Sequence, residues 1–194
     1  MPTLKNILMG VGFEHKLVSD FKQLSVLVKQ LKEGDFRIAL TQGVFDMFHV
    51  GHGRYLNEAR TYGDVLIVGV DSDELVRDMK GPTRPFDIFD ERVEILSMLA
   101  SVSIIIQRDI NQHKHDLIRL VQPDVLIMSQ TTSSFTDEDK TELDKYCGKI
   151  EHLVAKAATS TTAKMLRLRT EGSKELADRI HSTVNDFFEE NRGS

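Results

Sequence analysis

Apolar positions recur along this chain at two spacings, one typical of helices and one of buried strands. A first amphipathic helix is predicted over residues 14–33, ending near Gly34. Its apolar positions are three or four residues apart: Leu17, Phe21, Leu24, Val28 and Leu31. After Gly34, short apolar runs alternate with further helical patterns up to the end of the chain.

Five short runs have the composition of buried strands, and they cover residues 37–41, 64–71, 101–107, 124–129 and 150–154. Continuous apolar runs between polar residues are typical of parallel strands covered on both faces. Helical patterns separate them at residues 51–62, 72–79, 113–121 and 131–144, and Asp87 or Asp90 is predicted to cap a helix that runs to Leu99. The sequence therefore predicts an α/β fold, a parallel sheet wrapped by helices on both faces.

Two further helices are predicted after the last strand. Ser160, Thr161 and Thr162 form a capping sequence for a helix that ends near Arg169. A second helix over residues 173–190 has apolar positions on one side. It packs either across the sheet or against a second subunit, and the second arrangement, a homodimer, is favoured. The domain organisation is then a helical lead-in (1–36), a central domain (37–170) and a C-terminal helix (171–194).

Composition narrows the class of protein. The 194 residues are 40% hydrophobic, which is enough for one domain with a sizeable core, and the formal net charge is -5. A general nucleic-acid-binding protein would show a basic balance instead. One cysteine cannot form an internal disulfide, and neither a membrane-spanning run nor a signal peptide is apparent. A soluble cytoplasmic protein that binds neither membrane nor nucleic acid is predicted.

The chemistry of the chain is concentrated in the segment 41–52, Thr-Gln-Gly-Val-Phe-Asp-Met-Phe-His-Val-Gly-His. It joins the first predicted strand of the sheet to a helix, which is where open α/β sheets bind phosphate. Gly51 lets a phosphate approach the backbone, and His49 and His52 can donate hydrogen bonds to phosphoryl oxygens. Two other interpretations are a capping turn with solvated histidines and a zinc site. Zinc is disfavoured because the lone Cys147 supplies no further ligand at a recognisable spacing.

The pattern Gly-x-Phe-Asp-x-x-His-x-Gly-His after a strand resembles the signature of the nucleotidyltransferase superfamily. That superfamily includes cytidylyltransferases, adenylyltransferases and, more distantly, class I aminoacyl-tRNA synthetases. The resemblance implies a Rossmann-like, doubly wound parallel sheet of five strands in the order 3-2-1-4-5. It also places the site at the carboxyl ends of the first and fourth strands.

The resemblance implies roles for individual residues. The catalytic group would be His49, His52, Lys80 and Arg92. Nucleotide contacts would come from Thr41, Gly43, Val44, Phe45, His49, Gly51, His52, Arg92, Met128, Gln130, Ser160, Thr161 and Thr162. Substrate contacts would come from Asp46, Lys80 and Arg84, although Asp46 is expected to orient the turn rather than act as a base.

A second pattern, Lys-Gly-x-x-Arg-Pro from Lys80 followed by Arg92, is similar to that of heptose-phosphate adenylyltransferases. By this match Lys80 would meet the substrate phosphate or the α-phosphate, and Arg92 the nucleotide phosphates. Lysine is a mobile point charge, whereas arginine binds two oxygens at once. Without the resemblance, both residues are equally well interpreted as surface cations.

The chain departs from the family pattern in three places. Ala157 and Ala158 stand where an acid and a glycine precede Ser-Thr-Thr, and Gln42 replaces a common asparagine. The segment 128–132, Met-Ser-Gln-Thr-Thr, replaces a Gly-Asp element, which leaves the base open, although Gln130 can bond a base edge. His113 and His115, at the start of a predicted helix, are expected on the surface.

These features predict an enzyme that moves AMP or CMP from ATP or CTP to a phosphorylated sugar or polyol, with release of pyrophosphate. A heptose-type sugar 1-phosphate is the favoured acceptor. The expected cofactor is Mg²⁺, held mainly by the triphosphate and not by protein ligands alone. The alternatives are a cytidylyltransferase for glycerol 3-phosphate or another alcohol phosphate, and a nucleotide-binding regulatory protein without turnover.

Overall fold

A computed structural model of the chain describes residues 3–9, 13–130, 139, 142–154 and 169–182. The chain divides into two compact units, Met1–Ala157 and Ala158–Ser194. The predicted cap at Ser160, Thr161 and Thr162, its helix and most of the predicted helix 131–144 lie outside the described residues.

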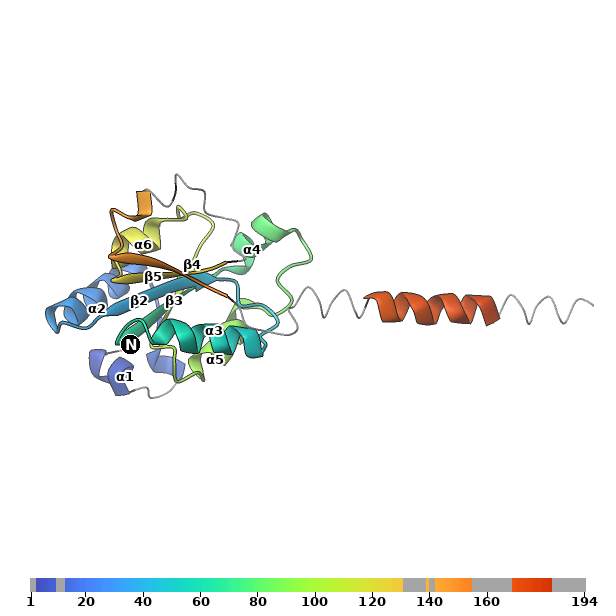
Figure 1. The fold of residues 1–194 in the computed structure, drawn as a ribbon, viewed down its shortest axis with the longest axis horizontal. Helices are drawn as coiled ribbons and strands as arrows, with labels where there is room; N and C mark the ends of the chain where they lie inside the picture. The colour runs from blue at the N-terminus through green and yellow to red at the C-terminus, as the bar shows by residue number, and fades with distance from the viewer. Residues whose placement is uncertain (1–2, 10–12, 131–138, 140–141, 155–168, 183–194) are drawn as a thin grey trace, which may run out of the picture. The chain divides into compact units, whose positions relative to one another are not determined.

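A parallel sheet forms the centre of the first unit (Figure 1). Its strands in the described chain are β1 (Leu17–Val18), β2 (Ile38–Gly43), β3 (Val65–Asp71), β4 (Ile104–Arg108), β5 (Val125–Ser129) and β6 (Lys149–Leu153). The spatial order is β1-β4-β3-β2-β5-β6, and every pair is parallel. The five predicted strands, β2 to β6, therefore have the predicted order, and the α/β class is confirmed.

The sixth strand corrects two predictions, the five-stranded sheet and the helix over residues 14–33. The segment contains a short 3-10 helix, η1 (Phe13–His15), then β1 beside β4, and only then α2 (Phe21–Glu33). The helix begins late because the Asp20 side chain caps it, accepting a hydrogen bond from the Gln23 N–H at 2.7 Å. Its predicted end at Gly34 is confirmed.

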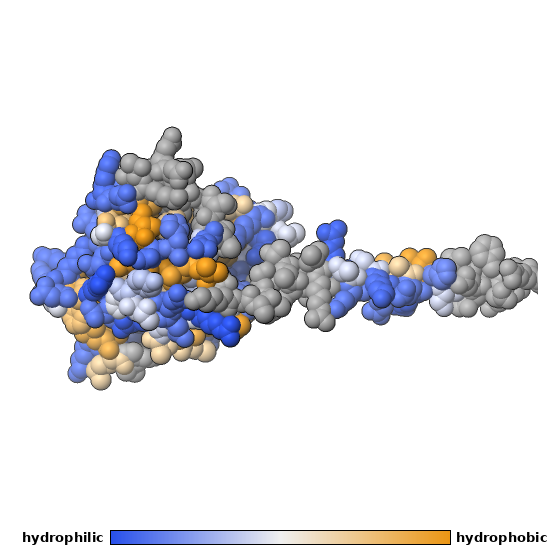
Figure 2. All heavy atoms as spheres, in the orientation of Figure 1, coloured by the Kyte–Doolittle hydropathy of each residue, from blue (hydrophilic) through white to orange (hydrophobic). Residues whose placement is uncertain are grey.

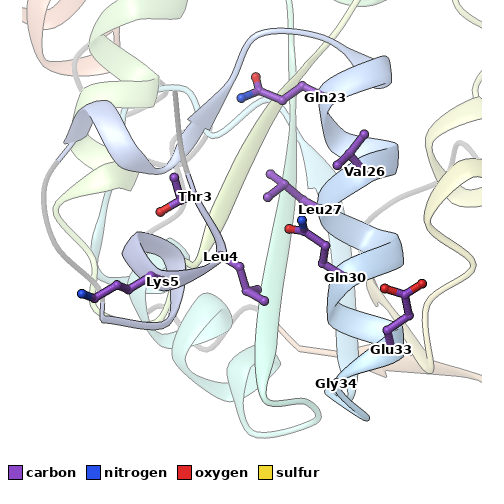
Figure 3. A pocket seen from close by; sticks show the side chains of 9 residues that line it. All are labelled: Thr3, Leu4, Lys5, Gln23, Val26, Leu27, Gln30, Glu33 and Gly34. Carbon is purple, nitrogen blue, oxygen red and sulfur yellow. The ribbon is translucent and has the colours of Figure 1, made fainter.

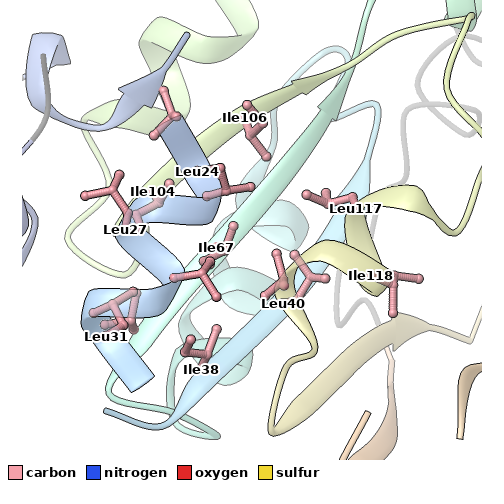
Figure 4. Close-up of a cluster of buried hydrophobic side chains, with 14 of the residues drawn as sticks. Leu24, Leu27, Leu31, Ile38, Leu40, Ile67, Ile104, Ile106, Leu117 and Ile118 are labelled. Atoms are coloured by element: carbon pink, nitrogen blue, oxygen red, sulfur yellow. The ribbon is translucent and has the colours of Figure 1, made fainter. Parts of the chain in front are cut away.

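Helices cover both faces of the sheet. The remaining helices of this unit that the structure describes with bounds are α1 (Leu4–Met9), α3 (Val50–Arg60), α4 (Asp73–Lys80), α5 (Phe89–Ser97) and α6 (Asp116–Val121). One buried cluster packs α2 and α6 against strand residues such as Leu40 and Ile67 (Figure 4). A second buried cluster packs α3 and α5 against the opposite face of the sheet, on strand residues such as Ala39 and Val68, which adjoin Leu40 and Ile67 in sequence. Alternate residues along each strand thus contribute to two hydrophobic cores, one on each face of the sheet.

Two helix starts test the predicted caps. Ser72 caps α4 as expected, since its side chain accepts from the Leu75 N–H at 3.2 Å. The predicted cap of α5 by Asp87 or Asp90 is wrong, because its N-cap is Ile88 and makes no side-chain bond. The carboxylate of Asp87 instead accepts from the Met47 N–H at 2.7 Å, which ties the start of α5 to the loop after β2.

The prediction that His113 and His115 are both surface residues is wrong for His115, which is only 1% exposed. Its ring lies between two carboxylates, with Nε2 3.2 Å from Asp139 and Nδ1 3.4 Å from Glu142. Residues distant in sequence therefore cover a histidine whose local pattern is polar.

The second unit contributes a helix over residues 169–182, in which every side chain is exposed. It begins before residue 173, where the helix was predicted to start. Most of its visible surface is hydrophilic, with an apolar patch (Figure 2), and Leu176 and Ile180 are 59% and 56% exposed. Among the described residues, no helix combines the length and apolar character needed to cross a bilayer.

Candidate functional site

The turn between β2 and α3 presents the two motif histidines. His49 is the N-cap of α3, and its Nδ1 accepts a hydrogen bond from the Gly51 N–H at 3.0 Å. In the neutral ring this bond places the proton on Nε2. His49 therefore caps its helix with one nitrogen and, in the neutral ring, carries its proton on the other.

His52 lies directly against His49, with ring centroids 4.1 Å apart and planes inclined by 18°. Phe45 and Phe48 contact the same ring, at 5.8 Å and 5.4 Å between centroids. Burial first, and the nearby positive charge of a protonated His49 second, lower the pKa of His52 to about 4. His52 is therefore neutral at pH 7, and its buried Nδ1 has no hydrogen-bond partner among the described residues.

The turn itself has an unusual backbone. Phe45 and Met47 have φ angles of 55° and 48°, in the left-handed region, where a non-glycine residue costs about 1–2 kcal/mol. Between them, Asp46 is 4% exposed and holds the conformation. Its Oδ1 accepts from the N–H groups of Phe86 and Asp87, at 3.0 and 2.9 Å.

The other carboxylate oxygen of Asp46 lies 2.7 Å from the Arg84 guanidinium. Asp46 thus joins the histidine turn to the loop that follows α4, and these contacts support the orienting role expected from sequence. Arg84 also lies over the Phe86 ring, at 4.7 Å from its centroid. This arrangement fixes Arg84 at the edge of the turn, and its substrate contact stays a prediction.

Arg92 lies beneath the turn and is 1% exposed. Its guanidinium donates to the carbonyls of Asp87, Val44 and Asp71, at 3.0, 2.6 and 2.8 Å. It also forms an ion pair with Asp73 at 2.7 Å. The predicted contact between Arg92 and nucleotide phosphates does not fit this arrangement, because the side chain is engaged by the scaffold that supports the turn.

Lys80 ends α4 and is exposed. Partial burial of the amine, and then the Arg84 guanidinium, lower the pKa of Lys80, while Asp71 and Asp46 oppose the shift. The charge of Lys80 in turn lowers the pKa of His52. The structure therefore brings the amine of Lys80 into the electrostatic neighbourhood of the histidine turn.

Other predicted nucleotide residues are held by packing. The hydroxyl of Thr41, which is fully buried, lies 2.8 Å from the Tyr55 hydroxyl, and Met128 is 5% exposed in the core of the α2 face. The side chains of these two residues therefore face the interior, and their predicted nucleotide contacts stay predictions. Gln130 is exposed after β5. Gly43 follows Thr41 at the end of β2, where a Cβ would meet the Phe45 ring at 3.5 Å.

The sequence interpretation missed a polar group at the ends of β3 and β4. Asp71 is 3% exposed, and one carboxylate oxygen lies 2.7 Å from Arg108 Nη1. The sequence did contain a signal: Asp71 and Arg108 are the charged residues that end the apolar runs of β3 and β4. Asp71 was interpreted only as the boundary of its strand.

The structure also has a hollow along α2, on the face of the sheet opposite α3 (Figure 3). Its lining includes Leu4, Val26 and Leu27, with Lys5 and Glu33 as its charged residues. It contains no histidine and none of the predicted site residues. The histidine turn therefore remains the candidate site.

Comparison with known proteins agrees with this geometry. The sequence model of the family described as Cytidylyltransferase-like matches residues 40–169. The chain belongs to this family. The matched range includes the histidine turn, Lys80 and the polar group at the ends of β3 and β4, so the resemblance inferred from the motif is confirmed.

The relatives include proteins named "Bifunctional protein HldE". The one from Geotalea uraniireducens is 35% identical over 87% of this chain and 35% of its own length. The one from Sulfurimonas denitrificans is 38% identical over 58% of this chain and 24% of its own. This chain thus spans about a quarter to a third of these relatives.

Among solved structures, the lipopolysaccharide core biosynthesis protein from Thermoplasma volcanium has a TM-score of 0.51 and 27% sequence identity. The match covers 61% of this chain and 96% of that one. The similarity agrees with the parallel sheet and its flanking helices.

Proposed function

We propose that this chain transfers a nucleotidyl group from ATP or CTP to a phosphorylated sugar, with release of pyrophosphate. The observation that carries the proposal is the stacked pair His49 and His52 at the start of α3, in a chain of the cytidylyltransferase-like family. Both rings belong to the turn at the carboxyl edge of the sheet, where phosphate-binding sites of this architecture lie, and the ring of His52 is neutral at pH 7.

The reaction is an in-line displacement. A phosphate oxygen of the acceptor attacks the α-phosphorus, a new P–O bond forms, and the bond to the bridging oxygen breaks as pyrophosphate leaves. Negative charge grows on the phosphoryl oxygens and on the leaving group. Preorganised donors stabilise that charge, and no covalent enzyme intermediate is needed.

The residues divide this work. Nε2 of His49 donates to a phosphoryl oxygen because its Nδ1 is already bonded to Gly51. His52 donates as a neutral ring, and Lys80 supplies a mobile positive charge for the attacking phosphate. Asp46 keeps the turn in place by accepting from the loop after α4, and Arg92 does so by donating to the Val44 carbonyl of the turn. Ser160, Thr161 and Thr162, outside the described residues, are proposed to meet the outer phosphates.

Magnesium would be held mainly by the triphosphate oxygens, which it would draw together and neutralise. The two buried acids near the turn are already engaged, Asp46 by Arg84 and Asp71 by Arg108. Neither offers the open carboxylate that a protein-held Mg²⁺ requires.

A carbohydrate acceptor is favoured by the pattern from Lys80 to Arg92 and by the relatives. One solved relative is named for lipopolysaccharide core biosynthesis, which is consistent with a sugar substrate. We propose a sugar 1-phosphate of the heptose type, and a polyol phosphate such as glycerol 3-phosphate as the second candidate.

The proposal is tested by incubating the protein and Mg²⁺ with each of four nucleoside triphosphates and a panel of sugar 1-phosphates and polyol phosphates. The expected result is pyrophosphate release that requires both substrates and is fastest with ATP and a heptose 1-phosphate. Triphosphate binding without turnover for any acceptor would instead support a regulatory protein.

A further inference from the structure

Three polar side chains lie at the carboxyl ends of neighbouring strands, on the face of the sheet covered by α6. Gln42 pairs with Gly69 across β2 and β3, and Asp71 pairs with Arg108 across β3 and β4. Gly69 and Asp71 are two residues apart and so face the same side. The three side chains therefore form one polar group, named here the Gln42–Asp71–Arg108 cluster.

Gly69 makes room for this cluster. A Cβ at that position would lie 2.5 Å from Leu117 Cδ2, 3.0 Å from Arg108 Cδ and 3.2 Å from Gln42 Cβ. The aliphatic parts of the Gln42 and Arg108 side chains therefore both pack directly on the backbone of Gly69. A side chain at position 69 would push them apart.

The cluster has unused hydrogen-bonding capacity. Gln42 Nε2 donates to the Lys114 carbonyl at a long 3.4 Å, while its buried Oε1 has no partner among the described residues. A buried acceptor without a partner is unfavourable and uncommon. Arg108 uses only Nη1, on Asp71, within the described chain, and its side chain is 14% exposed.

The electrostatics connect the cluster to the histidine turn. Burial raises the pKa of the Asp71 carboxyl, while the charges of Arg108, Arg92 and Lys80 act on it in the opposite direction. The charge of Lys80 therefore acts on Asp71 of the cluster and also on His52, whose pKa it lowers. A molecule whose phosphate meets Lys80 can extend from the turn over the ends of β3 and β4.

We propose that the Gln42–Asp71–Arg108 cluster binds the hydroxyl groups of the acceptor, while Lys80 holds the acceptor phosphate. A carboxylate and an amide oxygen accept from sugar hydroxyls, and a guanidinium donates to hydroxyl or ring oxygens. This assignment rests on the proposed function and adds the residues that select a carbohydrate. A site built from such groups rejects molecules that leave them unpaired.

The test uses Gln42→Leu and Arg108→Met in the full chain. The matched control is Arg37→Met, because Arg37 is exposed and precedes β2 at the opposite edge of the sheet. Each variant is assayed for KM with a heptose 1-phosphate and with glycerol 3-phosphate, and for the Kd of the Mg²⁺-triphosphate by calorimetry. Thermal unfolding checks that each variant is folded.

We expect Gln42→Leu and Arg108→Met to raise KM for the heptose 1-phosphate about tenfold to a hundredfold. KM for glycerol 3-phosphate should change less, because it has fewer hydroxyls, and the triphosphate Kd should stay unchanged. An unchanged KM for the heptose 1-phosphate in Gln42→Leu would overturn the proposal. So would an equal weakening of acceptor binding and triphosphate binding. Should Arg108→Met not fold, Gln42→Leu decides alone.

Failure of the cluster can be distinguished from failure of the proposed function. Calorimetric titration of wild type and Gln42→Leu with heptose 1-phosphate needs no turnover. Weaker binding to the variant supports the cluster even if no pyrophosphate appears. Equal binding of heptose 1-phosphate to both proteins, with normal pyrophosphate release, would show that the cluster does not bind the acceptor, while the proposed function would stand.

Discussion

At the scale of single residues, the two motif histidines differ in what holds them. His49 is fixed by its bond to the Gly51 N–H, whereas His52 is held by stacking and by aromatic neighbours. The neutral ring of His52 can donate to phosphate without the cost of burying a charge. The site is therefore built for donation by imidazole, with Lys80 as the added positive charge.

Removing either imidazole tests this division. We expect His49→Asn and His52→Asn to lower kcat by about a hundredfold to a thousandfold, the effect of losing one preorganised donor. The control is His181→Asn, which changes an exposed histidine on the helix of residues 169–182. Steady-state pyrophosphate release measures the effect. Values of kcat close to wild type would exclude the histidines from the reaction.

The lowered pKa of His52 also predicts how stability depends on pH. Between the unfolded pKa of about 6.5 and the folded pKa of about 4, the unfolded chain binds more protons at this ring, so stability falls as pH falls. We expect wild type to lose more stability than His52→Asn between pH 6.5 and 4.5, as measured by urea unfolding. Identical pH dependence in both proteins would contradict the assigned pKa.

At the scale of elements, the turn after β2 depends on the loop after α4 for its shape. Asp46, Asp87 and Arg92 connect the two segments through main-chain groups. These bonds offset the left-handed residues on either side of Asp46. A local sequence motif is thus positioned by residues about forty positions later in the chain.

Arg92 decides between a scaffold role and the phosphate contact predicted from sequence. Arg92→Met leaves three carbonyls and Asp73 without their partner, so we expect a loss of about 3–5 kcal/mol in the free energy of unfolding. Arg92→Lys, which keeps the charge, should recover part of it. A large loss of kcat with unchanged stability would instead indicate direct phosphate contact.

At the scale of the whole molecule, the order of the five longer strands was predictable because the motif implies a known topology. The short strand β1 was missed because Leu17 also fits the helical spacing of the residues after it, and only pairing with β4 reveals the strand. The burial of His115 depends on Asp139 and Glu142, which no local pattern indicates.

The site shows the same limit. The histidine turn could be located because its residues are contiguous, whereas the engagement of Arg92 depends on groups from several elements. The Gln42–Asp71–Arg108 cluster comes from three separate strands. Its chemistry becomes visible only when the register of the sheet is known.

The homodimer stays a prediction at this scale. Leu176 and Ile180 are one helical turn apart and exposed, so we expect them to contribute to a contact between copies. Light scattering should give twice the monomer mass for wild type and a lower mass for a protein carrying Leu176→Glu and Ile180→Glu. A wild-type monomer at micromolar concentration would contradict the prediction.

The most direct test of the account is a structure with Mg²⁺ and the α,β-methylene analogue of the preferred triphosphate. The account predicts phosphate oxygens about 3 Å from His49 Nε2 and from a ring nitrogen of His52, with Lys80 facing the α-phosphate. A triphosphate bound elsewhere, such as in the hollow along α2, with no phosphate contact to either histidine, would contradict it.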